Sequence, residues 1–155
     1  MKLRTIVLTL ALCFVAAAVC FAASDAQMGT WKLNEAKSNI AAGMPKNDTV
    51  VFEAAGDSVK VTIDGTSGDG KPVHGEWTGK IDGKDYPVTG DPTSDTRSYK
   101  QIDDHTMQFA GKKDGKVTLS GRVVVSADGK TRTVTVSGTD AAGKKLKSTA
   151  VYDKQ

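Results

Sequence analysis

The chain has 155 residues, of which 25% are charged, and its formal net charge is +3. Basic and acidic residues are mixed along the whole sequence without a basic block. This distribution argues against nucleic-acid binding, which normally needs a concentrated positive face with aromatic side chains.

The first 23 residues have the pattern of a secretory signal peptide, expected to be helical. Lys2 and Arg4 form a short positive start, an apolar run covers residues 6–19, and small residues follow. A membrane anchor is the alternative interpretation, but the run is at the short end of the roughly 20 apolar residues that span a bilayer. We therefore expect an exported protein, periplasmic or extracellular, with no stable membrane insertion once the signal is removed.

Cleavage is expected after Ala22 or Ala23, with Ala26 as the alternative position. Lipid attachment would need a cysteine that follows a small residue at the cleavage point, whereas Cys13 follows leucine and Cys20 follows valine. The mature chain then has no cysteine, 19 basic residues and 18 acidic residues. Its stability in an oxidising compartment must come from core burial and sheet hydrogen bonds rather than from disulfides.

From about residue 47 onward, runs of β-branched residues alternate with glycine-containing turns. Val117, Leu119, Val123 and Val125 share one face of their run, a period of two that is typical of half-buried strands. Asp-Gly pairs are strong hairpin signals. The predicted turns are Ala55-Gly56-Asp57, Asp64-Gly65, Gly68-Asp69-Gly70, Asp82-Gly83, Asp114-Gly115, Asp128-Gly129 and Ala142-Gly143. The best helical candidate in the mature chain is 35–42, one or two turns long.

The mature domain, 24–155, is therefore predicted to be all-β. The expected strands lie near 28–34, 48–54, 58–64, 71–81, 84–89, 96–102, 105–112, 116–126, 130–138 and 144–153. Consecutive strands with tight turns favour an up-and-down antiparallel barrel of about 8 to 10 strands, because closure removes exposed edges. A two-sheet sandwich is the alternative.

Short motifs at both ends of the mature chain resemble those of the lipocalin and fatty-acid-binding-protein (calycin) superfamily. Gly29-Thr30-Trp31 is similar to the Gly-x-Trp signature of the first strand, and Val151-Tyr152-Asp153-Lys154 is similar to the ending of the fatty-acid-binding proteins. The opening also resembles small exported bacterial lipocalin-like proteins of uncharacterised role. The resemblance implies a barrel in which Gly29 and Trp31 belong to the closed end, with Trp31 packing across the base.

Two departures from that pattern bear on the ligand. The fatty-acid-binding proteins place a helix pair between their first two strands, whereas 34–47 contains Gly43 and Pro45 and is too short for two helices. They also carry an arginine two positions before the C-terminal tyrosine, where this chain has Ala150. The resemblance therefore implies the barrel rather than fatty-acid binding.

Candidate ligand-binding residues are the large or charged side chains on strands. Trp77, Tyr99 and Phe109 are candidates to line a cavity, and Arg132 is the best candidate for a polar anchor, because it shares a face with Val134 and Val136. A surface position remains the alternative for Arg132. Arg97 and Arg122 are further candidates for an anchor. Many strand faces are Thr and Ser, which favours a partly polar interior.

The sequence carries no convincing catalytic or metal motif. His74 and Glu76 share one strand face, but His105 lies in a separate turn, and zinc sites usually need three or four protein ligands. The Asp103-Asp104 pair is expected in turn-like sequence for structural reasons. We therefore predict no enzyme activity, no metal site and no cofactor.

Two functions remain open at this stage. The first is an exported, non-catalytic barrel that binds a small molecule of unknown identity. The second is a protein–protein interaction or inhibitor module of the cell envelope. The irregular segment 82–95 is interpreted as a corner where the meander bends, with a recognition loop as the alternative. The first predicts an enclosed cavity, and the second predicts a filled interior with an exposed apolar patch.

Overall fold

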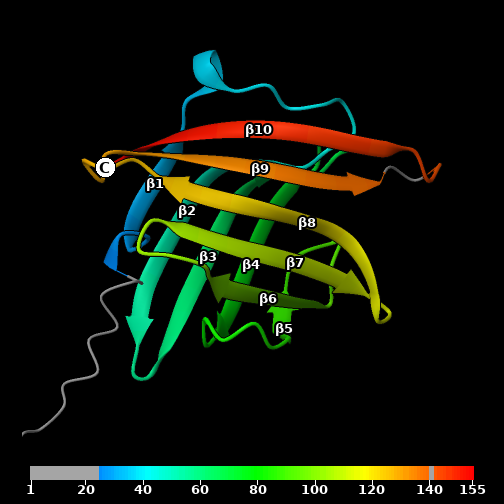
Figure 1. Cartoon of the computed structure of the whole chain (residues 1–155). Helices are drawn as coiled ribbons and strands as arrows, with labels where there is room; N and C mark the ends of the chain where they lie inside the picture. Colours follow the sequence, from blue (N-terminus) through cyan, green and yellow to red (C-terminus); the bar gives the residue numbers. More distant parts are fainter. Residues whose placement is uncertain (1–24, 140–141) are drawn as a thin grey trace, which may run out of the picture.

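The computed structural model describes residues 25–139 and 142–155, and the predicted signal peptide lies outside the described residues. Within them, ten strands form one closed antiparallel barrel (Figure 1). The strands are β1 Gly29–Leu33, β2 Lys46–Ala55, β3 Ser58–Thr66, β4 Pro72–Gly79, β5 Tyr86–Thr89, β6 Thr96–Gln101, β7 Thr106–Lys113, β8 Lys116–Val125, β9 Thr131–Thr139 and β10 Lys145–Lys154.

Each strand pairs with the next along the chain, and β1 closes the barrel between β2 and β10. Trp31 is opposite Val50 of β2 and Lys154 of β10, so the blue first strand lies beside the red last strand in Figure 1. The prediction of an up-and-down barrel is confirmed, and the sandwich alternative is wrong. Closure pairs both outer strands of the meander and so removes the exposed edges that an open sheet would have.

The connection between β1 and β2 contains one short 3-10 helix, Glu35–Lys37, where a helix of one or two turns was predicted. The side chain of Asn34 caps it by accepting a hydrogen bond from the backbone N–H of Lys37 at 3.2 Å. Beyond the helix, the connection pairs with β10 through the Asn39–Thr149 bridge. This segment therefore runs along the sheet and leads the chain across one end of the barrel.

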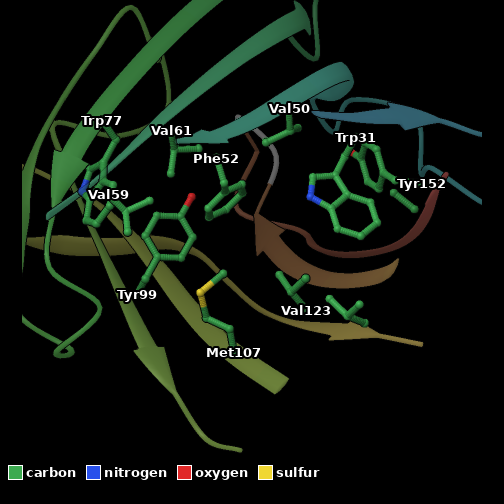
Figure 2. Close-up of a cluster of buried hydrophobic side chains, with 12 residues drawn as sticks. Trp31, Val50, Phe52, Val59, Val61, Trp77, Tyr99, Met107, Val123 and Tyr152 are labelled. Carbon is green, nitrogen blue, oxygen red and sulfur yellow. The ribbon is translucent and has the colours of Figure 1, made fainter. Parts of the chain in front are cut away.

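Side-chain alternation places one face of every strand inside the barrel, as the period of two predicted. The buried cluster contains apolar and aromatic side chains from most of the strands (Figure 2). Its members are Trp31, Val50, Phe52, Val59, Val61, Trp77, Tyr99, Met107, Val123, Val125, Ala150 and Tyr152. The barrel therefore has a single hydrophobic core. The described residues contain no disulfide.

Trp31 is fully buried at the end of the barrel where the chain enters. Its indole Nε1 donates a hydrogen bond to the backbone oxygen of Gln27 at 2.8 Å. Gly29 has a φ of +104°, and a Cβ there would lie 3.1 Å from Cε of Lys154, whose ammonium is 5.2 Å from the Trp31 ring centroid. The closing role that the resemblance implies for Trp31 stays a prediction.

One predicted turn is wrong. Asp64-Gly65 lies within β3, where the two residues are opposite His74 and Val73 of β4. A Cβ on Gly65 would collide with the backbone oxygen of Lys46, because β2 comes unusually close where its register shifts. Here the glycine permits close backbone approach rather than a turn.

Candidate ligand cavity

A cavity of about 90 Å³ lies inside the barrel, between the core cluster and the end formed by the β1–β2, β3–β4 and β5–β6 connections. Its walls are mainly apolar side chains that point inward from seven strands, β3 to β5 and β7 to β10. They include Ile63, Val88, Phe109, Leu119, Val134 and Ala150. Trp31 does not line the cavity, although both lie inside the same barrel.

The β1–β2 connection covers the cavity with Ile40, Met44 and Pro45. It is held by two backbone hydrogen bonds between Asn39 and Thr149, at 2.7 and 2.9 Å. These contacts fix the connection across the end of the barrel, and we refer to residues 38–45 as the roof.

The β5–β6 loop, residues 90–95, forms the side of the cavity next to the roof. Asp91 Oδ1 accepts hydrogen bonds from the backbone N–H of Thr93 at 2.8 Å and from its hydroxyl at 2.6 Å. Thr118 of β8 donates to the backbone oxygen of Thr93 at 2.9 Å. Ser94 is buried against Gly111, which has no side chain to obstruct it. The loop is thus fastened to the barrel wall at several points.

The 90–95 loop and β6 bring one ion pair into the cavity wall. Arg97 Nη2 lies 2.5 Å from Asp91 Oδ2, and the two side chains are only 9% and 12% exposed. Arg97 Nε is also buried, and no residue within the described ranges accepts a hydrogen bond from it. The wall therefore has balanced charge and one donor without an acceptor.

Gly90 determines whether the loop can turn at this point. Its φ is +71°, and a Cβ would collide with the backbone oxygen of His74. Gly129 has nearly the same φ, +70°, but open space around it, so it is a matched control. We expect Gly90→Ala to lower the free energy of unfolding by about 3 kcal/mol and Gly129→Ala by about 1 kcal/mol, measured by urea denaturation. Equal losses would contradict the close approach at Gly90.

Two of the four predicted ligand-binding residues pack in the core beneath the cavity. The rings of Trp77 and Tyr99 meet edge to face with their centroids 4.8 Å apart, and Trp77 Nε1 donates to the backbone oxygen of Arg97 at 2.9 Å. Phe109, whose ring centroid is 6.1 Å from that of Tyr99, lines the cavity itself. Figure 2 shows Trp77 at one end of the cluster and Trp31 at the other, with Tyr99 and Phe52 between them.

Arg132, the predicted anchor, is buried but does not line the cavity. Its guanidinium carbon lies 4.9, 5.2 and 4.8 Å from the ring centroids of Trp31, Phe52 and Tyr152. Burial lowers the pKa of Arg132 to about 10, so the group is still a cation at neutral pH. The three rings stabilise this charge through their π faces, and we refer to them as the aromatic cage.

Nothing in the sequence singles out Asp91 as a site residue, and Arg97 is only one of several arginines on predicted strands. The signal available in the sequence was the Asp91-Pro92 step in the least regular segment. The pairing itself depends on how the loop folds back over β6. Arg122, the third arginine considered, is exposed on the outer face of β8.

His74 and Glu76 both lie on the outer face of β4, as their shared face predicted. His74 Nδ1 is 2.6 Å from Asp64 Oδ1, while Glu76 pairs with Lys60 at 2.6 Å. No group of three or more His, Cys, Asp or Glu side chains that could hold a metal occurs in 25–139 or 142–155.

The Asp64 hydrogen bond raises the pKa of His74 above its usual 6.5, with the carboxylate charge adding to the effect. The stabilisation is fully present below pH 6.5, where both folded and unfolded histidine are protonated, and is lost as the pH rises through the raised folded value. We expect an NMR titration of the His74 ring to show a midpoint above 6.5, and Asp64→Asn to lower it. An unchanged midpoint in the variant would show that the pair does not form in solution.

The outer surface offers only isolated apolar side chains within the described residues. The large exposed ones are Ile102, Val117 and Val124, at 42%, 59% and 42% exposure. Scattered residues of this kind are normal on soluble domains and do not make a contiguous docking patch. Separately, none of the helices in the described part of the chain is long and apolar enough to span a membrane.

The fold and site thus define a ten-stranded up-and-down β-barrel with an internal cavity. No protein-family model and no curated protein matches the chain. Among solved structures, a redesigned β-barrel, mFAP1, bound to DFHBI is similar with a TM-score of 0.48 and 16% identity, covering 85% of this chain and 98% of that one. The redesigned barrel b11L5F_LGL is similar with a TM-score of 0.45 and 17% identity, covering 88% and 97% of the two chains.

Proposed function

We propose that this chain is an exported, non-catalytic β-barrel of calycin-like type that binds a small molecule in the cavity beneath the roof. The observation that supports the proposal is the cavity itself: apolar walls surround a single buried ion pair that carries an unsatisfied donor. Ligand sites in proteins commonly combine mainly apolar walls with a few polar groups that fix orientation.

The volume of the cavity limits the ligand. An engineered cavity of about 150 Å³ in another protein holds one benzene molecule, and the cavity here measures about 90 Å³. The ligand, or the part of it that enters the barrel, is therefore a compact group of no more than about six non-hydrogen atoms, the number in benzene. A longer molecule would have to displace the roof residues Met44 and Pro45.

The alternative function, a protein–protein interaction or inhibitor module, predicts a filled interior and an apolar surface patch. The cavity and the scattered surface residues favour ligand binding instead. Export forms part of the proposal because of the N-terminal signal pattern. The mass of the protein recovered from the periplasm or the medium should correspond to cleavage after Ala22 or Ala23.

Native mass spectrometry of the protein purified from its own host tests small-molecule binding. We expect a fraction that carries an additional small mass, which is released on denaturation. Ala150→Phe fills the cavity from β10 and should abolish this mass, whereas Val151→Phe, one residue along and on the outer face, should retain it. A clean mass of the unliganded protein in all three samples would contradict the proposal.

A further inference from the structure

The balance of charge in the cavity wall indicates which ligands it accepts. We infer that the cavity takes a compact neutral ligand with an oxygen acceptor, such as a small amide, in preference to a carboxylate of the same shape. This inference rests on the proposed function, since it concerns the same cavity and specifies the ligand's chemical class.

The first step is electrostatic. Asp91 and Arg97 are the charged residues that line the cavity, and they already pair with each other at 2.5 Å. A carboxylate that entered would lose its hydration and lie close to the Asp91 carboxylate, while the charge of Arg97 is already compensated. A neutral ligand meets neither penalty.

The second buried cation, Arg132, makes no direct contact at the cavity surface. Arg132 lies outside the cavity lining, and the aromatic cage covers it at 4.8 to 5.2 Å. A ligand in the cavity therefore cannot reach the Arg132 guanidinium with a hydrogen bond. Arg97 is the arginine that it can contact directly.

The third step concerns the donor on Arg97. Its Nε is buried and has no acceptor among the described residues, and a buried donor left unpaired is costly. Arg97 lines the cavity, so a small shift of its side chain would let an oxygen on the ligand accept a hydrogen bond from Nε while Nη2 keeps its bond to Asp91. The apolar walls would then accommodate the remainder of a small, mainly hydrocarbon ligand.

The test compares isobutyramide with isobutyrate, which have nearly the same shape but differ in charge. Both are titrated into the ¹⁵N-labelled mature protein, and backbone amide shifts are followed at Leu119, Val134 and Ala150. We expect isobutyramide to bind at least tenfold more tightly than isobutyrate. Equal binding, or tighter binding of isobutyrate, would overturn the inference and leave the proposed function intact. If neither compound binds, the inference fails, and native mass spectrometry decides on the proposed function separately.

Two variants sharpen the comparison. Asp91→Asn leaves Arg97 uncompensated and should strengthen isobutyrate binding at least tenfold. Asp95→Asn is its matched control, because Asp95 lies in the same loop but is exposed and pairs with Lys113 at 2.5 Å; its ligand preference should equal that of the wild type. Identical preferences in the two variants would contradict the role given to Asp91.

A third variant keeps the inference testable if Asp91→Asn does not fold. Arg97→Met removes the Nε donor and should weaken isobutyramide binding at least fivefold. Unchanged isobutyramide affinity would show that Arg97 does not contact the ligand. The wild-type comparison of the two compounds needs no variant and can overturn the inference by itself.

Discussion

Replacing Trp31 with alanine should lower the free energy of unfolding by about 4 kcal/mol, among the largest losses expected from a single core truncation. Trp31 is fully buried, so the variant leaves a cavity at the closed end of the barrel. It also removes one ring of the aromatic cage, which leaves the buried Arg132 cation less well stabilised.

Urea denaturation followed by far-UV circular dichroism measures this loss without relying on tryptophan fluorescence. Trp31→Phe is the matched control: it retains a ring beside Arg132 and much of the buried volume, so we expect a loss of about 2 kcal/mol. A loss below about 1 kcal/mol in the alanine variant would show that Trp31 does not close the barrel.

Breaking the buried ion pair should have the second large effect. Asp91→Asn removes the counter-charge of a buried cation and should cost about 3 kcal/mol. Arg97→Met should cost less, about 2 kcal/mol, because Asp91 keeps its two hydrogen bonds from Thr93. The two stability losses differ because Asp91 keeps hydrogen-bond partners when Arg97 is replaced, whereas Arg97 loses its counter-charge when Asp91 is replaced.

A double-mutant cycle separates the pair from its surroundings. The variant that carries both Asp91→Asn and Arg97→Met should be destabilised by at least about 1 kcal/mol less than the sum of the single losses, because neither charge remains buried alone. Strictly additive losses would contradict a direct interaction between Asp91 and Arg97 in solution.

The barrel could be predicted from sequence because its signals are local. Alternation along a strand, as from Leu119 to Val125, reports which face is buried. The turn at Asp114-Gly115 has the two positive φ values that an Asp-Gly hairpin requires. Asp64-Gly65 is the same residue pair but lies within β3. Its glycine is needed because the backbone of the neighbouring strand β2 comes too close for a side chain. Sequence alone does not distinguish these two uses of glycine.

The cavity could be predicted only in part, because its polar group depends on folding in three dimensions. Arg132 has the interior position that its face predicted, but the rings of Trp31, Phe52 and Tyr152 from three other strands enclose it. Arg97 lines the cavity instead. The 90–95 loop folds back over β6 and places the Asp91 carboxylate beside it. The alternation of residues along a strand cannot predict such a contact between a loop and a strand.

Xenon bound under pressure in a crystal of the mature protein tests most directly whether the barrel contains a cavity that a guest can enter. Apolar cavities take up xenon, and we predict a xenon site among Phe109, Leu119 and Val134, beneath the roof, that disappears in Ala150→Phe. A wild-type crystal with side chains filling this space, or with xenon only on its outer surface, would contradict the account.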